Sequence, residues 1–188
     1  MNILRTIGAP TKPWAPRNGQ LAWWPLNEGS GTSVADIIGG LTGTMSAEGW
    51  ADGKFGSSMN FKNFRVPDAA ALRGMAELSI SAWIKRKAST NIKLCGYWHA
   101  TSQHYIVREE SQKMTFYTNT TSSVSQAFPD VISAGWHFVA FTYNGAAMNG
   151  YLDGVRVVGP TAQSGAINNG STAAYLYVGA EYDGNINR

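Results

Sequence analysis

The strongest constraint on the fold is a strict alternation of side chains in residues 78–85, LSISAWIK. Leu78, Ile80 and Ile84 fall on one side of an extended chain, whereas Ser81 falls on the other. A period of two residues is that of a β-strand with one buried face. About a dozen similar short runs occur along the chain, separated by Gly, Asn or Ser. This spacing predicts an all-β, antiparallel sandwich or barrel.

Composition supports the same fold class. Only 14% of the residues are charged, and the chain holds 21 glycines and 7 prolines. Helical proteins usually carry more Glu and Lys on their surfaces, whereas many turns need Gly and Pro. The length of 188 residues suits one domain with a single core. The net charge of +3 is too small to indicate a nucleic-acid partner.

Three features of the sequence bear on where the protein acts. The sequence contains one cysteine, Cys95, so no internal disulfide is expected. The first residues lack the apolar core of a secretory signal peptide. No stretch approaches the roughly 20 apolar residues that span a bilayer, so no membrane insertion is expected. Export by another route, or release inside a virus particle at lysis, stays open, and we expect an extracellular or virion-associated setting without a signal peptide in this chain.

Residues 1–19 differ from the rest. Pro10, Pro13 and Pro16 recur every three residues and flank Trp14. Such a segment favours extended conformations and is excluded from a sheet interior. We interpret it as an N-terminal arm, either a loose tail or a segment that docks on a neighbour. The domain then comprises residues 20–188.

Several local elements can also be predicted. Both faces of GWHFVAFTYNG, residues 135–145, are largely apolar, which is typical of a central strand. Asp153-Gly154 is a favoured pair for the type I′ turn of a hairpin. Residues 68–76 allow a single helical turn. Residues 20–26, QLAWWPL, have the composition of a first strand.

Six motifs occur in the order found in one known family. They are LAWWPLNEGSGTSVAD, GWADGKFGSSMNF, VPDAAAL, LSISAWIK, GWHFVAFTYNGAAMNGYLDGVRV and LYVGAEYDG. Over residues 20–184 the chain thus resembles the laminin-G-like, concanavalin A-like lectin/glucanase jelly-roll domains. The resemblance implies a two-sheet antiparallel jelly roll that binds sugars or proteins, often with a structural calcium ion.

The sequence departs from this family at its end. Family members usually close with a strand of the type GxIDEVRIYNRAL, whereas this sequence stops at EYDGNINR. The last strand of a jelly roll lies near the first, so residues 21–26 are expected to lose a neighbour. Truncation, the N-terminal arm, or a partner chain that supplies a strand would each account for this.

A calcium site is a weaker expectation. Glu28 and Asp36 are the candidate ligands, because the family often binds the ion near these positions. Calcium needs six or more oxygen ligands. The loop after Asp36 carries Ile37 and Ile38 where polar residues are common in the family. A structural role for Glu28 as a turn residue is the alternative.

The sequence offers little for catalysis. Glycosidases of this fold carry two acids in a Glu-x-Asp-x-x-Glu or Glu-x-Asp-x-Glu run on one strand. The nearest match, EYDGNI, supplies Glu181 and Asp183 but lacks the last acid. Glu109 and Glu110 are adjacent and would point to opposite faces of a strand. Composition leaves a Ser-His-Asp set open, although no Gly-x-Ser-x-Gly motif occurs.

The histidines and the cysteine have structural explanations. We expect His99 and His104 to be polar surface or loop residues rather than metal ligands. His137 lies mid-strand and is interpreted as a partly buried, hydrogen-bonded residue. Cys95 lies in an apolar run and is expected in the core, not as a nucleophile.

The candidate binding residues come from stretches that mix aromatic rings with amide, carboxylate and arginine groups. Aromatic faces stack on sugar C–H groups, and the polar groups bond the hydroxyls. The stretches are GYWHATSQHYIVRE, FYTNTTSS and EYDGN. The candidates are Tyr97, Trp98, His99, Gln103, Tyr105, Arg108, Tyr117, Asn119, Tyr182 and Asp183. Trp23, Trp24, Trp83 and Trp136 are assigned to the core or a sheet face instead.

The sequence as a whole favours a non-catalytic module that recognises a glycan or a protein surface. The alternative is a structural, decoration or adhesion protein of a virus particle, such as a phage head or tail. It is favoured by the proline-rich arm and the missing closing strand. A glycoside hydrolase or lyase is the third hypothesis.

Overall fold

The computed structural model describes residues 19–60, 63–86, 92–99, 102–130, 132–169 and 175–181. Within these ranges the chain forms fourteen strands and one short 3₁₀ helix, η1 (Ala70–Leu72). The strands are β1 (Ser33–Val34), β2 (Gly43–Met45), β3 (Trp50–Asp52), β4 (Ser57–Met59), β5 (Phe64–Pro67), β6 (Leu78–Arg86), β7 (Ile92–His99), β8 (Ser102–Glu110), β9 (Lys113–Asn119), β10 (Ser123–Ala127), β11 (Gly135–Tyr143), β12 (Ala147–Leu152), β13 (Val155–Ala162) and β14 (Tyr175–Glu181).

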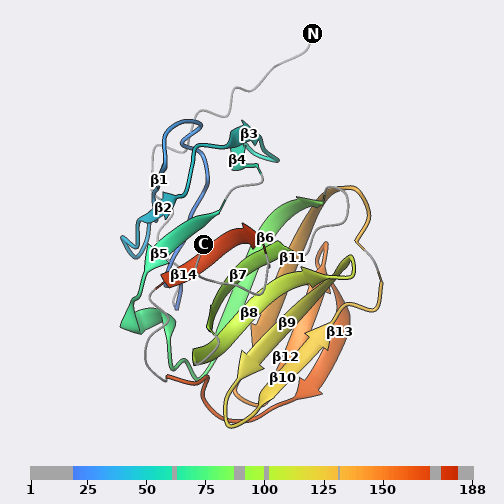
Figure 1. The fold of residues 1–188 in the computed structure, drawn as a ribbon. Helices are drawn as coiled ribbons and strands as arrows, with labels where there is room; N and C mark the ends of the chain where they lie inside the picture. The colour runs from blue at the N-terminus through green and yellow to red at the C-terminus, as the bar shows by residue number, and fades with distance from the viewer. Residues whose placement is uncertain are drawn as a thin grey trace.

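The strands build two stacked antiparallel sheets and a separate hairpin (Figure 1). The larger sheet has the order β1-β2-β5-β14-β7-β8-β9-β10, and the smaller has the order β13-β12-β11-β6. Strand β14, the last along the chain, lies inside the larger sheet between β5 and β7. The prediction of an all-β, antiparallel two-sheet jelly-roll sandwich is confirmed.

The alternation that constrained the fold is present in β6. Its residues change from half-buried to exposed at every step, with Leu78 at one end and Arg86 at the other. Strand β11 pairs with β6 on one side and with β12 on the other, so it is the central strand that its apolar composition predicted. Its inward side chains Val139, Phe141 and Tyr143 are buried.

The local turn predictions are also confirmed. Leu152 of β12 pairs with Val155 of β13, so Asp153 and Gly154 form a two-residue hairpin turn. Their φ angles of 50° and 85° are both positive, as a type I′ turn requires. The helical turn expected in residues 68–76 is the single turn η1.

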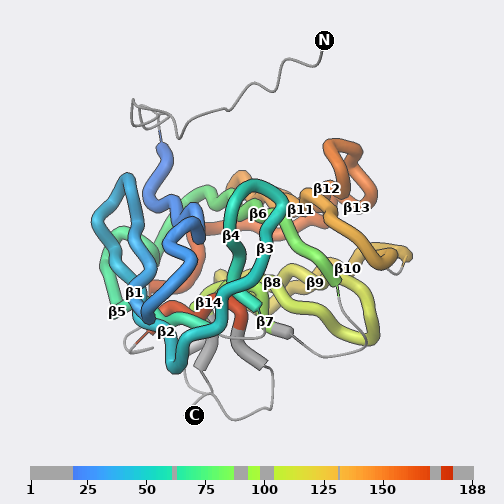
Figure 2. Tube along the Cα trace, turned by 90° about the horizontal axis from the view of Figure 1, so that it is seen from above, coloured from blue at the N-terminus to red at the C-terminus, as the bar shows by residue number. Residues whose placement is uncertain are grey.

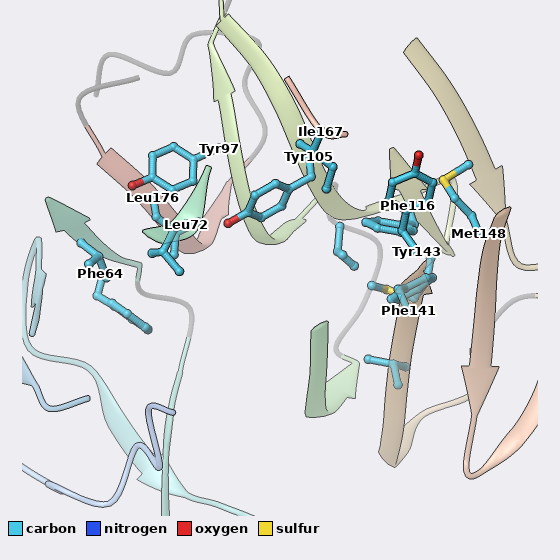
Figure 3. Packing of buried hydrophobic residues seen from close by; sticks show 14 of the residues in the cluster. Phe64, Leu72, Tyr97, Tyr105, Phe116, Phe141, Tyr143, Met148, Ile167 and Leu176 are labelled. Atoms are coloured by element: carbon cyan, nitrogen blue, oxygen red, sulfur yellow. The ribbon is translucent and has the colours of Figure 1, made fainter. Parts of the chain in front are cut away.

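The core fills the space between the two sheets (Figure 3). The ring centroid of Phe141 lies 5.4 Å from that of Phe116 and 5.1 Å from that of Phe128. Phe116 belongs to the larger sheet and Phe141 to the smaller one. Burial of such rings is the main favourable term in folding, and it joins the two sheets here.

An ion pair joins the two sheets beside this core. The Arg86 Nε on β6 donates to the Glu109 Oε1 on β8 at 3.1 Å, and both side chains are largely buried. The Arg86 Nη1 also donates to the carbonyl oxygen of Ile132 at 3.3 Å. The guanidinium therefore ties the loop that precedes β11 to both sheets.

The expected first strand is not formed. Residues 20–29 adopt no regular structure. The backbone N–H of Trp23 donates to the Asp36 carboxylate at 2.8 Å, and the Trp24 Nε1 donates to the carbonyl of Leu41 at 2.9 Å. Pro25 has no N–H to give to a sheet. Side-chain and loop contacts therefore replace the ladder that the composition of this segment suggested.

The hairpin β3–β4 stands apart from both sheets, and its turn reaches toward β6 (Figure 2). Phe55 of this turn lies 5.7 Å from Trp83 of β6, measured between ring centroids. No helix in the described part of the chain has the length and apolar character needed to span a bilayer. Of the predicted N-terminal arm, residues 1–18 lie outside the described residues.

Candidate functional site

A continuous row of residues crosses the outer face of the larger sheet, the face turned away from the smaller sheet. Each member pairs directly with the next on a neighbouring strand. From β5 to β10 the row reads Arg65, Tyr177, Gly96, Ile106, Tyr117 and Ser125. The chain neighbours Val66, Val107, Phe116 and Leu176 belong to the core. Side chains alternate along a strand, so the row lies on the outer face, where Ile106 is itself 0% exposed and Tyr117 and Tyr177 are half-buried.

The centre of the row has no large side chain on β7. A Cβ added to Gly96 would lie 2.9 Å from the Cβ of Ile106 and 2.8 Å from the carbonyl oxygen of Tyr105. Any other residue at Gly96 would therefore collide with β8. Tyr177 and Tyr117 lie on either side of this position, three strand spacings or roughly 14 Å apart. The two rings are thus well separated on the outer face of the larger sheet.

Three tyrosines of this face each lie under a cation. The Arg65 Cζ is 4.5 Å from the ring centroid of Tyr175, and the Arg108 Cζ is 4.5 Å from that of Tyr117. The Lys93 Nζ is 5.6 Å from the ring centroid of Tyr177. Such cation–π contacts fix the orientation of the rings. We call these six residues, together with Glu110, the tyrosine–cation surface.

Hydrogen bonds order one end of the tyrosine–cation surface. The Arg108 Nη2 donates to the Glu110 Oε1 at 2.6 Å and to the Tyr117 hydroxyl at 2.9 Å. The Tyr117 hydroxyl donates to the Glu110 Oε2 at 2.7 Å. Each of the three side chains thus contacts the other two. This arrangement holds an aromatic face, a guanidinium and a carboxylate in fixed positions before any ligand binds.

Tyr117 and Tyr177 stay neutral at physiological pH. Partial burial raises the pKa of Tyr117, and its hydrogen bond to Glu110 raises it further, against the lowering effect of Arg108. Partial burial also raises the pKa of Tyr177, against the lowering effect of Arg65. Neutral phenols can both donate and accept hydrogen bonds. The Tyr117 hydroxyl uses both roles, because it donates to Glu110 and accepts from Arg108, and this keeps its ring in a fixed orientation.

The sequence-predicted binding residues separate into three groups. Arg108 and Tyr117 belong to the tyrosine–cation surface, and Asn119 follows Tyr117 on the same face of β9. Tyr97 and Tyr105 instead lie in the core, 0% and 2% exposed, with their ring centroids 6.0 Å apart. Both point between the sheets and are excluded from the proposed surface (Figure 3).

The remaining candidates lie, wholly or in their side chains, outside the described residues. Trp98 and His99 lie on β7 and Gln103 on β8, but their side chains are outside the described part of the structure. Tyr182 and Asp183 lie outside the described residues, as does the side chain of Glu181. Their roles in binding stay predictions.

Sequence reasoning missed Arg65, Lys93, Tyr175 and Tyr177. A usable signal was present in residues 175–178, YLYV, where tyrosines alternate with aliphatic residues. On a strand with one buried face, Leu176 and Val178 must point inward, which leaves both tyrosines outward. Arg65 and Lys93 give no comparable signal, because their approach to the rings depends on strand pairing between distant segments.

His104 differs from expectation. It was predicted on the surface or in a loop, but it is 0% exposed. Its Nδ1 contacts the carbonyl oxygen of Asn168, and its ring lies edge-on to Tyr97 at 5.9 Å between centroids. Because carbonyl oxygen accepts only, Nδ1 carries the proton. His104 therefore helps to anchor the segment around Asn168.

Cys95 is expected to be unreactive in the native protein. Burial raises the pKa of its thiol to about 12, and only the thiolate attacks disulfide reagents. Ellman's reagent at about pH 8 should leave the folded protein unmodified and titrate the single thiol after denaturation. Rapid colour release from the folded protein would contradict the core assignment of Cys95.

The contacts of Asp36 do not fit a calcium ligand. Its Oδ1 accepts from the N–H groups of Trp23 and Ile38, and its Oδ2 from those of Gly39 and Leu41, all at 2.8–3.0 Å. These donors present positive ends where a cation would have to sit. Burial alone would raise the pKa of Asp36, but the N–H donors outweigh it and lower the pKa.

Glu28, the second calcium candidate, accepts a hydrogen bond from the N–H of Ala35 at 2.8 Å. Among the described residues, no group of three or more His, Cys, Asp or Glu could hold a metal ion. The contacts of Glu28 and Asp36 favour structural roles for both residues, in which each fastens a loop at the start of the domain.

The smaller sheet carries a second, more apolar outer face. Trp83 lies 5.6 Å from Phe138 and 5.7 Å from Phe55 between ring centroids, and the Lys54 Nζ lies 5.1 Å from its ring. Phe55 is 67% and Trp83 40% exposed. We call Phe55, Trp83 and Phe138 the aromatic cluster. It places Trp83 on a sheet face, as the sequence indicated.

The family described as the concanavalin A-like lectin/glucanases superfamily matches residues 58–187. No curated protein matches the sequence. The binding domain of Paraclostridial Mosquitocidal Protein 1 is similar in structure, with a TM-score of 0.63 and 12% identity. The alignment covers 83% of this chain and 45% of that one. This chain thus spans about half the length of that toxin domain.

Two further solved structures share the fold. One is domain 4 of AbnA, an extracellular arabinanase of Geobacillus stearothermophilus, solved with arabinotriose; its TM-score is 0.58 and its identity 18%. The alignment covers 79% of this chain and 78% of the AbnA domain. The other is a structure of botulinum neurotoxin type C, whose cell entry is described as dependent on interaction with two ganglioside molecules; its TM-score is 0.51 and its identity 17%. The alignment covers 85% of this chain and 50% of the neurotoxin chain. All three are similar in fold, and two are named as binding domains or as interacting with gangliosides.

Proposed function

Because the chain belongs to the concanavalin A-like lectin/glucanase superfamily, we propose that it is a binding module whose tyrosine–cation surface holds an acidic glycan. The observation that carries this proposal is the presence of three tyrosines that each pair with a cation on one outer face. Tyrosine rings stack on the apolar faces of sugars, and guanidinium groups bond carboxylate or sulfate. One surface thus supplies both kinds of contact.

The charge of the surface favours an acidic ligand. Among the described side chains of the tyrosine–cation surface, Arg65, Lys93 and Arg108 are positive and Glu110 is negative, and Lys93 and Arg108 are only 2% and 8% exposed. Arg108 is already bound to Glu110, so Arg65 is the more accessible cation, and it is exposed to solvent. A uronic acid, a sialic acid or a sulfated sugar would complement this balance. Neutral sugars would use the rings alone.

The fold relatives support binding at a general level. The mosquitocidal toxin domain and the neurotoxin domain are named for binding or for interaction with gangliosides, and the arabinanase domain was solved with arabinotriose. At these identities the likeness concerns the fold alone. The glycan class assigned to this chain therefore depends on the tyrosine–cation surface and not on the relatives. We further propose that the module acts outside the cell.

A glycan array with matched acidic and neutral members tests the proposal. We expect retention on glycans that carry uronate, sialate or sulfate, and weaker retention on neutral counterparts of the same backbone. Raising the ionic strength should weaken the acidic contacts, because the Debye length is about 10 Å at 0.1 M and shortens as salt is added. Equal binding to charged and neutral members, or no binding to any acidic glycan, would contradict the proposal.

Recognition of a protein surface is the second candidate function. The exposed aromatic cluster favours it, because contiguous exposed aromatic area is typical of interaction sites. A structural or adhesion role on a virus particle, with or without a strand from a partner chain, belongs to this candidate. It predicts saturable assembly that Trp83→Ser abolishes while glycan binding is unchanged.

A further inference from the structure

A serine, a histidine and an aspartate form a hydrogen-bonded relay at one end of the smaller sheet. The Ser133 Oγ lies 2.9 Å from the His137 Nε2, and the His137 Nδ1 lies 2.8 Å from the Asp153 Oδ2. Both distances fall within the range of about 2.6–3.2 Å that joins a nucleophile to its base and the base to its orienting acid. The tyrosine–cation surface belongs to the other sheet, so its binding function does not use this relay.

Three different elements bring these residues together. Ser133 precedes β11, His137 lies on β11, and Asp153 occupies the turn between β12 and β13. The second carboxylate oxygen of Asp153 accepts the N–H of Phe138 at 2.9 Å, and the N–H of Asp153 donates to the carbonyl of Phe138 at 2.8 Å. The turn is therefore fixed against β11, and the carboxylate is held in place.

The relay has a defined direction. The His137 hydrogen bond and the Phe138 N–H lower the pKa of Asp153, so its carboxylate is ionised and can only accept. In neutral His137 the Nδ1 therefore carries the proton, which leaves the Nε2 lone pair for the serine. The Ser133 hydroxyl then donates to Nε2. This is the proton arrangement that a nucleophilic serine requires.

Ser133 is accessible and contributes nothing to fastening the turn. Its side chain is exposed, whereas that of His137 is 18% exposed. The contacts between Asp153 and β11 already fix the turn without the serine. A hydroxyl that is open to solvent on one side and bonded to an oriented imidazole on the other is placed to react.

We propose that Ser133, His137 and Asp153 form a nucleophilic site that accepts an acyl group from a small, exposed ester. The Ser133 Oγ attacks the ester carbonyl as its proton passes to the His137 Nε2. The ester C–O bond breaks, and the departing alkoxide takes that proton and leaves as the alcohol. Water then loses a proton to the His137 Nε2 and attacks the acyl-serine carbonyl. The bond between the acyl carbon and the Ser133 Oγ breaks, the Oγ takes the proton back from His137, and the carboxylic acid leaves. The exposed position of Ser133 suits a short acyl group carried on a larger molecule.

A fluorophosphonate probe with peptide mapping by mass spectrometry tests the site directly. The serine displaces fluoride from phosphorus, so a covalent adduct at Ser133 is the expected product. Ser133→Ala should abolish this adduct, and His137→Gln should slow its formation by a factor of about 100 or more, because a positioned base contributes that much. Hydrolysis of 4-nitrophenyl acetate should fall in parallel.

Two further variants separate reactivity from folding. Asp153→Asn keeps an oxygen for the Phe138 N–H and tolerates the positive φ at this position, so the hairpin should persist while labelling slows. Ser81→Ala, on the exposed face of β6, should leave labelling unchanged. The proposal is overturned if Ser133 labels no faster than Ser79 and Ser81, or if His137→Gln leaves the rate unaltered in a protein with the wild-type circular dichroism spectrum.

Discussion

Replacing Tyr177 or Tyr117 with alanine is expected to weaken glycan binding by about 10- to 30-fold each. A ring at the centre of a binding surface is worth roughly 1.5–2 kcal/mol, and 1.4 kcal/mol corresponds to a factor of ten. Tyr177 lies opposite Gly96, and Tyr117 is bonded to Arg108 and Glu110. Loss of either ring removes one stacking face and leaves its partner cation without a fixed support. Isothermal titration with the acidic glycan from the array measures the change.

Replacing Tyr117 and Tyr177 together tests the tyrosine–cation surface more strictly than either single change. The two rings are three strand spacings or roughly 14 Å apart and share no contact, so their effects should add to a factor of about 100 or more. Tyr151→Ala on the smaller sheet is the matched control and should bind as the wild type does. Unchanged binding in the double variant would move the ligand site away from the tyrosine–cation surface.

The sequence predicted the core more fully than it predicted the tyrosine–cation surface. The alternation in β6 and the apolar faces of β11 predicted the sandwich, because burial on one face of a strand leaves a period of two in the sequence. The same rule places Tyr105 and Val107 on one face of β8 and Ile106 and Arg108 on the other. It does not say which face is inward, because both faces are buried.

The mixed composition of residues 96–109 also placed a core residue among the binding candidates. A mixture of aromatic and polar residues placed Tyr97 and Arg108 in one candidate set, although Tyr97 lies in the core. Its hydroxyl accepts the N–H of Ala69 at 3.1 Å, which satisfies the polar end of a buried ring. That contact joins residues 28 positions apart along the chain. Sequence proximity alone gives no access to such a partner.

The relay at Ser133 shows the same limit for chemistry. The sequence left a Ser-His-Asp set open and assigned His137 to a partly buried, hydrogen-bonded position, which its contacts confirm. No sequence motif links Ser133 and His137 to Asp153, because Asp153 lies in the hairpin turn after β12, 16 residues beyond His137. Only the pairing of β11 with β12 brings the carboxylate to the imidazole.

Replacing Asp36 with asparagine is expected to lower the free energy of unfolding by about 3 kcal/mol at neutral pH. The change keeps the volume but removes the charge, and it turns an NH₂ group toward two of the four N–H donors that the carboxylate now accepts. Hydrogen bonds to a charged group contribute about 1.5–3 kcal/mol each, and part of this is regained by relaxation. In a chain of this length the melting temperature should fall by roughly 6–12 °C.

The pH dependence of this difference identifies its cause. The folded protein lowers the pKa of Asp36 below the value of about 3.9 found in unfolded chains, so its stabilising effect is complete above that value. It is lost as the pH falls through the lower, folded pKa, because the protonated carboxyl no longer accepts from four donors. Denaturant titrations of wild type and Asp36→Asn should therefore differ most at neutral pH and converge in acid. The control is Glu28→Ala, which removes one exposed hydrogen bond to Ala35. It should lower the free energy of unfolding by less than about 1 kcal/mol. If the difference in the free energy of unfolding between wild type and Asp36→Asn persists unchanged into strong acid, then the carboxylate charge is not what fastens residues 21–24 to the domain.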